Sequence, residues 1–243
     1  MRKRTCYLLV LSAATAAAVC FGAWNYLGTP LITLTKDQFG LTFKSRDTTT
    51  IRHETGAFDT IRLDLTNTDI RIQAGDDYSV TWQGPKQNCP SFRVKNGVLT
   101  AAESTSKKHA IFNSDEITTV TVPRDLNDLK DVSLASDNGD LTIAPDHTIT
   151  LSTLDLNSEN GDIDLSGCSG TTITANTENG DISVSPADSL KNYTVSADTG
   201  SGDVRIGNNS YSSDDDHSSI QVGNGLQKLS LRTENGDIDV KDP

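Results

Sequence analysis

Short runs in which apolar and polar residues alternate fill the second half of the chain, and they recur around one motif. The clearest copy is Ser158-Glu159-Asn160-Gly161-Asp162-Ile163-Asp164-Leu165. In every copy, apolar residues stand seven and five positions before the glycine and two and four positions after the glycine. A period of two predicts β-strands that bury one face, so each copy should contain two short strands around a turn.

The motif occurs five times, with its glycines at positions 139, 161, 180, 202 and 236. The steps between them are 22, 19, 22 and 34 residues, and a degenerate copy, Thr66-Asn67-Thr68-Asp69, precedes them. A period near 20 residues is typical of solenoids, in which stacked units bury a core that no single unit can build. We therefore predict an all-β, right-handed β-solenoid similar to a parallel β-helix over residues 58–241. The alternative is an antiparallel β-sandwich or meander made of the same ribbons.

The turn between the two strands carries Asn-Gly in four of the five copies. The copy around Gly202 carries Ser-Gly instead. Asparagine and glycine tolerate positive φ, so the turn could be a tight hairpin or a corner. The predicted turn residues are Asn138, Gly139, Asn160, Gly161, Asn179, Gly180, Gly202, Asn235 and Gly236.

The beginning of the chain resembles a membrane signal-anchor. Three cations at positions 2–4 precede an uncharged run over residues 6–27, which is long enough to span a bilayer. Positively charged residues on the short N-terminal side of the apolar run keep the N-terminus in the cytoplasm. We therefore expect a cytoplasmic tip (1–5), a transmembrane helix (6–27), a stalk (28–57) and an extracytoplasmic repeat domain (58–241). Alternatives are cleavage after Ala16-x-Ala18 and, more weakly, lipidation of Cys20.

Composition and the absence of known motifs exclude several classes of function. The net charge is −12 and no basic patch is visible, which argues against nucleic-acid binding. Only Cys89 and Cys168 lie outside the apolar segment, so there is no disulfide framework. The four histidines stand in unrelated contexts, and no hydrolase or metalloprotease motif occurs. The sequence therefore predicts a protein without catalytic activity.

The repeat also raises a question about metals. Stacked copies would align five aspartates about 4.8 Å apart, and like charges on neighbouring strands repel one another. Hydrogen bonds to turn amides are the expected compensation, and a Ca²⁺ ladder is the alternative. The aspartates are Asp140, Asp162, Asp181, Asp203 and Asp237. A second possible Ca²⁺ site is the run Asp214, Asp215 and Asp216, although a solvated loop is the simpler expectation there. No other cofactor is expected.

Several segments together resemble a known family. They are Phe58-Asp59-x-Ile61-x-Leu63, Asp69-Ile70-x-Ile72, Val120-Thr121-Val122-Pro123 and the repeated Asn-Gly-Asp-Ile units. This order is similar to the bacterial adhesin-like family of β-strand repeats called DUF4097, over about residues 57–241. The resemblance implies a β-solenoid-like fold, export or membrane attachment and, in some members, a link to cell-envelope stress operons. It implies no catalytic or binding residues.

We therefore expect a single-pass cell-membrane protein whose repeat domain is a non-catalytic surface module, either an adhesin or an envelope-stress protein. Its rigid side would face a surface protein or a glycan. One alternative is a β-helix enzyme that acts on polysaccharide. Another is a structural surface protein that associates end to end, because the final strand at Ile238–Val240 has no obvious cap.

Overall fold

The computed structural model describes residues 31–35, 38–42, 48–103, 116–124, 128–211 and 218–243. The chain forms two compact units. In the first, β1 (Leu31–Thr35) and β2 (Gln38–Thr42) form an antiparallel pair. The predicted transmembrane segment 6–27 lies outside the described residues. Within the described residues, no helix has the length and apolar character needed to cross a membrane.

The second unit is a stack of coils. Each coil consists of a first strand, a corner and a second strand, and the first and second strands belong to different sheets. The first strands are β4 (Thr60–Leu65), β10 (Asp128–Ser136), β12 (Ile149–Asn160), β14 (Cys168–Asn179), β16 (Tyr193–Ser201) and β20 (Gln227–Asn235). The second strands are β5 (Asp69–Gly75), β11 (Leu141–Ile143), β13 (Ile163–Ser166), β15 (Ile182–Ser185), β17 (Val204–Ile206) and β21 (Ile238–Val240).

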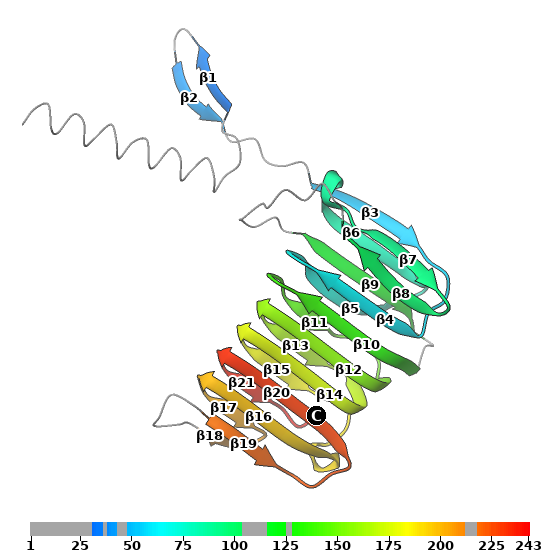
Figure 1. The fold of residues 1–243 in the computed structure, drawn as a ribbon, viewed down its shortest axis with the longest axis vertical. Helices are drawn as coiled ribbons and strands as arrows, with labels where there is room; N and C mark the ends of the chain where they lie inside the picture. Colours follow the sequence, from blue (N-terminus) through cyan, green and yellow to red (C-terminus); the bar gives the residue numbers. More distant parts are fainter. Residues whose placement is uncertain (1–30, 36–37, 43–47, 104–115, 125–127, 212–217) are drawn as a thin grey trace, which may run out of the picture. The chain divides into compact units, whose positions relative to one another are not determined.

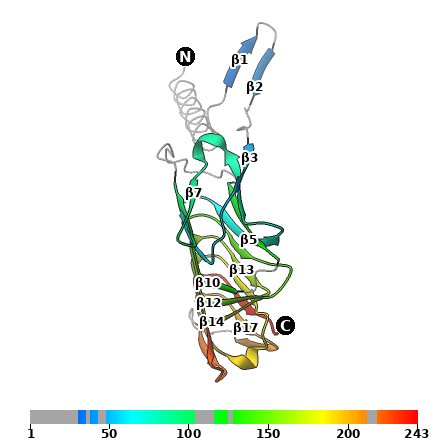
Figure 2. The ribbon, with the colours of Figure 1, turned by 90° about the vertical axis from the view of Figure 1, so that its right-hand side faces the viewer.

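Neighbouring coils pair in parallel, and the motif is aligned from coil to coil. Ser136 lies opposite Ser158, and Ser158 lies opposite Thr177, so equivalent positions superpose. The all-β, solenoid-like stacking is therefore confirmed, whereas the antiparallel alternative is wrong for the repeats. Figure 2 shows the two sheets on opposite sides of the stack, with β10, β12 and β14 in one and β5, β13 and β17 in the other.

One coil is out of sequence order. We call β20 and β21 the C-terminal coil, β14 and β15 the fourth coil, and β16 and β17 the fifth coil. β20 pairs with both β14 and β16, and β21 pairs with both β15 and β17 (Figure 1). The C-terminal coil therefore lies between the fourth and fifth coils. The expectation of an uncapped final strand is wrong, because β21 has a partner on each side.

The core lies between the sheets and is built in columns. One column contains apolar side chains that occupy the same motif offset, and each is at most 2% exposed. Its members in stacking order are Ile61, Val132, Leu154, Ile173, Leu229 and Val195. Because every coil contributes to each column, burial continues through the stack, which is the source of stability in repeat folds.

Further strands extend both ends of the stack, and the outermost of them pair antiparallel. At one end are β3 (Thr48–Glu54), β6 (Ser79–Pro85) and β9 (Ile117–Pro123) in one sheet, and β7 (Ser91–Lys95) and β8 (Val98–Ala102) in the other. At the opposite end are β18 (Asn209–Tyr211) and β19 (Ser218–Val222). Short 3₁₀ turns cover Lys86–Asn88 and Leu190–Asn192. The predicted stalk 28–57 needs correction, because β3 within it pairs with β6 and belongs to the sheet.

Candidate functional site

The Asn-Gly-Asp turns are corners rather than hairpins, since the chain passes there from one sheet to the other. Asparagine side chains link these corners through a ladder of amide hydrogen bonds. Asn179 Nδ2 donates to Asn160 Oδ1 over 2.9 Å, and Asn235 Nδ2 donates to Asn179 Oδ1 over 2.9 Å. The same contact joins Asn160 to Asn138 and Asn138 to Asn67. The ladder stops at the fifth coil, where Ser201 takes this position.

The aspartates form a second ladder beside the first. The backbone N–H of each aspartate after Asp69 donates to Oδ1 of the preceding aspartate in the stack, over 2.8 to 3.1 Å. The order along the stack is Asp69, Asp140, Asp162, Asp181, Asp237 and Asp203. Each of the first five carboxylates therefore caps the next coil and not its own turn. These hydrogen bonds oppose the repulsion between aligned carboxylates.

Serine and threonine hydroxyls form a third ladder inside the corner. Ser158 Oγ donates to the carbonyl oxygen of Gly139 over 3.1 Å, and Thr177 Oγ1 donates to that of Gly161 over 3.0 Å. Thr233 and Thr199 repeat the contact with Gly180 and Gly236. A small hydroxyl three residues before each glycine thus satisfies a carbonyl group in the adjacent coil.

The corner glycines are required for space. A Cβ on Gly161 would lie 2.3 Å from the carbonyl oxygen of Gly139, and a Cβ on Gly180 would lie 2.2 Å from that of Gly161. Neither glycine has a positive φ, and among the described non-glycine residues only Asn96 does. The interpretation through positive φ is therefore wrong for Gly139, Gly161 and Gly180, whereas Gly202 and Gly236 have φ 153° and 157°. It also applies to the β7–β8 hairpin, where Asn96 has φ 52° and Gly97 has φ 77°.

The metal hypotheses have little geometric support in the described residues. These residues contain no group of three or more His, Cys, Asp or Glu side chains that could hold a metal ion. Each of the first five ladder carboxylates already accepts a backbone hydrogen bond through Oδ1. The predicted loop site at Asp214, Asp215 and Asp216 lies outside the described residues.

The two cysteines do not resemble activated nucleophiles. Cys168 is buried, and burial raises its pKa to about 12. Burial also raises the pKa of Cys89, whose Sγ lies 3.9 Å from Nε2 of His53. A reactive cysteine needs a lowered pKa, because the thiolate is the nucleophile.

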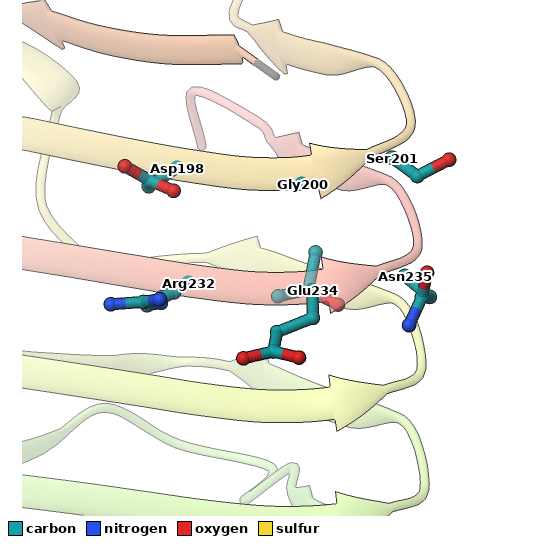
Figure 3. A pocket seen from close by; sticks show the side chains of 7 residues that line it. Asp198, Gly200, Ser201, Arg232, Glu234 and Asn235 are labelled. Atoms are coloured by element: carbon teal, nitrogen blue, oxygen red, sulfur yellow. The ribbon is translucent and has the colours of Figure 1, made fainter. Parts of the chain in front are cut away.

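A shallow surface pocket of about 330 Å³ lies over β16 and β20 (Figure 3). Its lining residues are Asp198, Gly200, Ser201, Arg232, Thr233, Glu234 and Asn235. Figure 3 shows Arg232 and Glu234 on one strand and Asp198 on the strand beside it. Arg232 and Asp198 are register partners on the parallel pair, so opposite charges meet on the outer face. The pocket is the strongest candidate site in the described part of the chain.

The pocket continues a row of polar side chains across the same face. Asn157, Asn176, Arg232 and Asp198 occupy one register position on four consecutive strands, and we call them the outer row. Asn176 Nδ2 donates to Asn157 Oδ1 over 3.0 Å, and Asn157 Nδ2 donates to Asp155 Oδ1 over 3.0 Å. Sequence reasoning missed this row. Its signal was the outward-facing residue four positions before each glycine.

Comparison with known protein families identifies the family to which this chain belongs. The sequence profile of the Toastrack DUF4097 family matches residues 58–242. The chain belongs to this family. The resemblance inferred from the repeats is thereby confirmed. The Toastrack match begins after β3, so this edge strand lies outside the matched region. A comparison with curated proteins gave no match.

One solved structure shows the same fold, and a second is more distantly similar. A candidate cell adhesion protein from Clostridium sporogenes has a TM-score of 0.52 and 15% identity, and the alignment covers 81% of this chain and 99% of that chain. A candidate adhesin from Bacteroides fragilis has a TM-score of 0.39 and 14% identity, with 81% and 98% covered. At this identity, the Clostridium likeness establishes the Toastrack fold and not a shared activity.

Proposed function

We propose that this Toastrack chain is a non-catalytic interaction module on the outside of a bacterial cell, held at the membrane by residues 6–27. In this proposal it serves as an adhesin or senses the state of the envelope. The designation of the Clostridium sporogenes structure as a candidate cell adhesion protein supports a surface role. The apolar N-terminal run with its three preceding cations supports the anchor.

The single observation that carries the proposal is the pocket on the outer row. Arg232 presents a guanidinium group between Asn176 on one side and Asp198 on the other, on strands fixed by parallel pairing. Guanidinium groups bind carboxylates in a bidentate manner, and the flanking amide and carboxylate groups add donors and acceptors. A rigid face with both signs of charge is suited to a polar partner.

We favour a protein over a glycan as the partner. The pocket lining and the outer row contain no aromatic side chain, and stacking on aromatic rings is a common feature of sugar sites. The pocket is also open and shallow, as are many protein-binding surfaces before a partner covers them. An acidic or mixed-charge loop of a surface protein would complement Arg232.

The test uses cells that display the full-length chain, with adhesion to envelope-derived protein fractions and to purified glycans measured in parallel. Arg232→Glu should lower adhesion about tenfold, as expected for the loss of one charge-assisted contact. Lys228→Glu is the matched control, because it makes the same charge change on the outward face of β20 outside the pocket. Equal losses in both variants would reject the pocket as the site.

A deletion tests the surface interaction role of the whole repeat domain independently of the pocket. Removal of residues 58–241 should abolish adhesion or the envelope-stress response while residues 1–57 are still produced. If neither property changes, the proposal of a surface interaction module is wrong. Turnover of a wall glycan that depends on the outer-row residues would instead favour the polysaccharide enzyme.

A further inference from the structure

The C-terminal coil lies between two coils that precede it in the chain. Only residues 186–192 join the fourth coil to the fifth coil, yet the two coils do not pair with each other. The space between them is occupied by residues that follow about 20 positions after the fifth coil ends at Ile206. In the folded chain, Gln227–Val240 therefore separates the fourth coil from the fifth coil.

The C-terminal coil is held by the same ladder hydrogen bonds that join the other coils to one another. Toward the fourth coil, Thr233 donates to Gly180 and the N–H of Asp237 donates to Asp181. Toward the fifth coil, Asp237 Oδ1 accepts the N–H of Asp203. These contacts require threonine, asparagine and aspartate at fixed offsets. They do not require that the inserted coil belong to the same chain.

The last step of the connection to the C-terminal coil is short. β19 pairs with β16, and only residues 223–226 lead from β19 to β20. The N–H of Gly225 donates to the carbonyl oxygen of Tyr193 over 3.3 Å, so this segment lies against the fifth coil. Leu226, the residue before β20, is 97% exposed and is the one exposed large hydrophobic residue in the described part of the chain. Short hinge segments of this kind favour exchange between copies, because an opened hinge leads the following strand into the same space in another molecule.

We propose that the C-terminal coil, Gln227–Val240, is exchanged between two copies of this chain, so that each copy fills the gap between the fourth and fifth coils of the other. The partner is a second copy because it supplies the required ladder residues at the required offsets. Reciprocal exchange preserves the hydrogen bonds of the ladders, so the closed monomer and the dimer differ mainly in the entropy of association. This inference does not depend on the proposed function.

Engineered cysteines on adjacent strands report the exchange. Thr174 and Ser230 are register partners on β14 and β20, outside the pocket. Neighbouring strands lie about 4.8 Å apart, within the Cα separation that a disulfide spans. Full-length chains carrying Thr174→Cys and chains carrying Ser230→Cys are mixed, unfolded and refolded together in mild detergent, and then oxidised. Peptide mapping then identifies any disulfide between positions 174 and 230.

Exchange predicts a disulfide-linked dimer of the two single variants, and the ratio of dimer to monomer should rise about tenfold for a tenfold increase in monomer concentration. The double variant Thr174→Cys/Ser230→Cys should also form the link within one chain. Mixing Thr174→Cys chains with Ser196→Cys chains is the matched control. Those positions are two strands apart, at about 9.6 Å, and should give only background linkage.

Two outcomes would overturn the proposal. In one, the mixed single variants link no more than the control while the double variant links within its own chain. The C-terminal coil would then insert only into its own molecule. In the other, the double variant fails to link, and the insertion between the fourth and fifth coils is itself wrong.

Discussion

The backbone N–H of Asp237 donates a hydrogen bond to Oδ1 of Asp181 over 2.8 Å, although 56 residues separate the two aspartates in the chain. The same contact joins Asp181 to Asp162, only 19 residues away. The aspartate ladder therefore requires only that two coils be adjacent in space. The number of residues between the two aspartates in the sequence does not matter. This property lets the C-terminal coil occupy the interior of the stack.

Replacing Gly161 by alanine should lower the free energy of unfolding by about 1–3 kcal/mol, because the new Cβ would meet the carbonyl oxygen of Gly139 at 2.3 Å. Gly56→Ala is the control, since a Cβ at Gly56 meets nothing within 4 Å. Urea unfolding measures both changes. Gly161→Asn would be well tolerated if positive φ were the requirement, and we expect it to destabilise at least as much as alanine.

Asp181→Ala should destabilise the domain by about 1 kcal/mol, because the N–H of Asp237 loses its charged acceptor. Asp181→Asn keeps an acceptor oxygen and removes one of the aligned charges, so its stability should equal or exceed that of the parent chain. Asp203→Ala is a matched comparison at the end of the ladder and should cost less. A larger loss for asparagine than for alanine at position 181 would contradict the capping role.

Calcium should leave the thermal midpoint of the repeat domain unchanged. A ligand that binds only the folded state stabilises it by about 2.7 kcal/mol at 100 times its Kd, which a melting curve would reveal. The purified chain is melted in EDTA and then in millimolar Ca²⁺, followed by circular dichroism. A chain with Asp214, Asp215 and Asp216 replaced by serine separates the two hypotheses. A calcium shift that persists in that variant would establish the ladder as a metal site.

Stability should fall as the pH rises from about 9 to about 12. Burial raises the pKa of Cys168 to about 12 in the folded state, whereas the free thiol has a pKa of 9.0. Between these values the unfolded chain releases a proton that the folded chain retains, so unfolding becomes more favourable with increasing pH. Cys168→Ala should make the pH dependence shallower, whatever its own cost in packing. Equal slopes for both chains over this range would exclude the contribution of Cys168.

The repeat offsets were enough to predict the strands, their inward faces and their parallel register. Leu154 and Leu156 alternate with polar residues, and burial of the apolar side chains is what such alternation favours. The glycine positions were also correct, but positive φ was the wrong reason for Gly139, Gly161 and Gly180. The same Asn-Gly dipeptide adopts two different structures in this chain. It forms a hairpin turn with positive φ at Asn96, and it forms a crowded corner at Gly161.

The order of the coils could not be predicted, because every coil offers the same edges to its neighbours. Threonine at 177, 199 and 233 and aspartate at 181, 203 and 237 fit one another in any sequence. The outer row was missed for a related reason. Arg232 and Asp198 stand at a solvent-facing offset, and the pattern of burial places no restriction on the residue there.

The interior place of the C-terminal coil has a consequence during protein synthesis. Domains generally begin to fold from the N-terminus as the ribosome extends the chain. A solenoid built in sequence order would lose only its tip to a premature stop codon. Here, a product that ends before Gln227 lacks the middle one of its last three coils, so β14 and β16 lose the strand that pairs with both. The native order of coils in the second half therefore forms only after residues 227–240 have been synthesised.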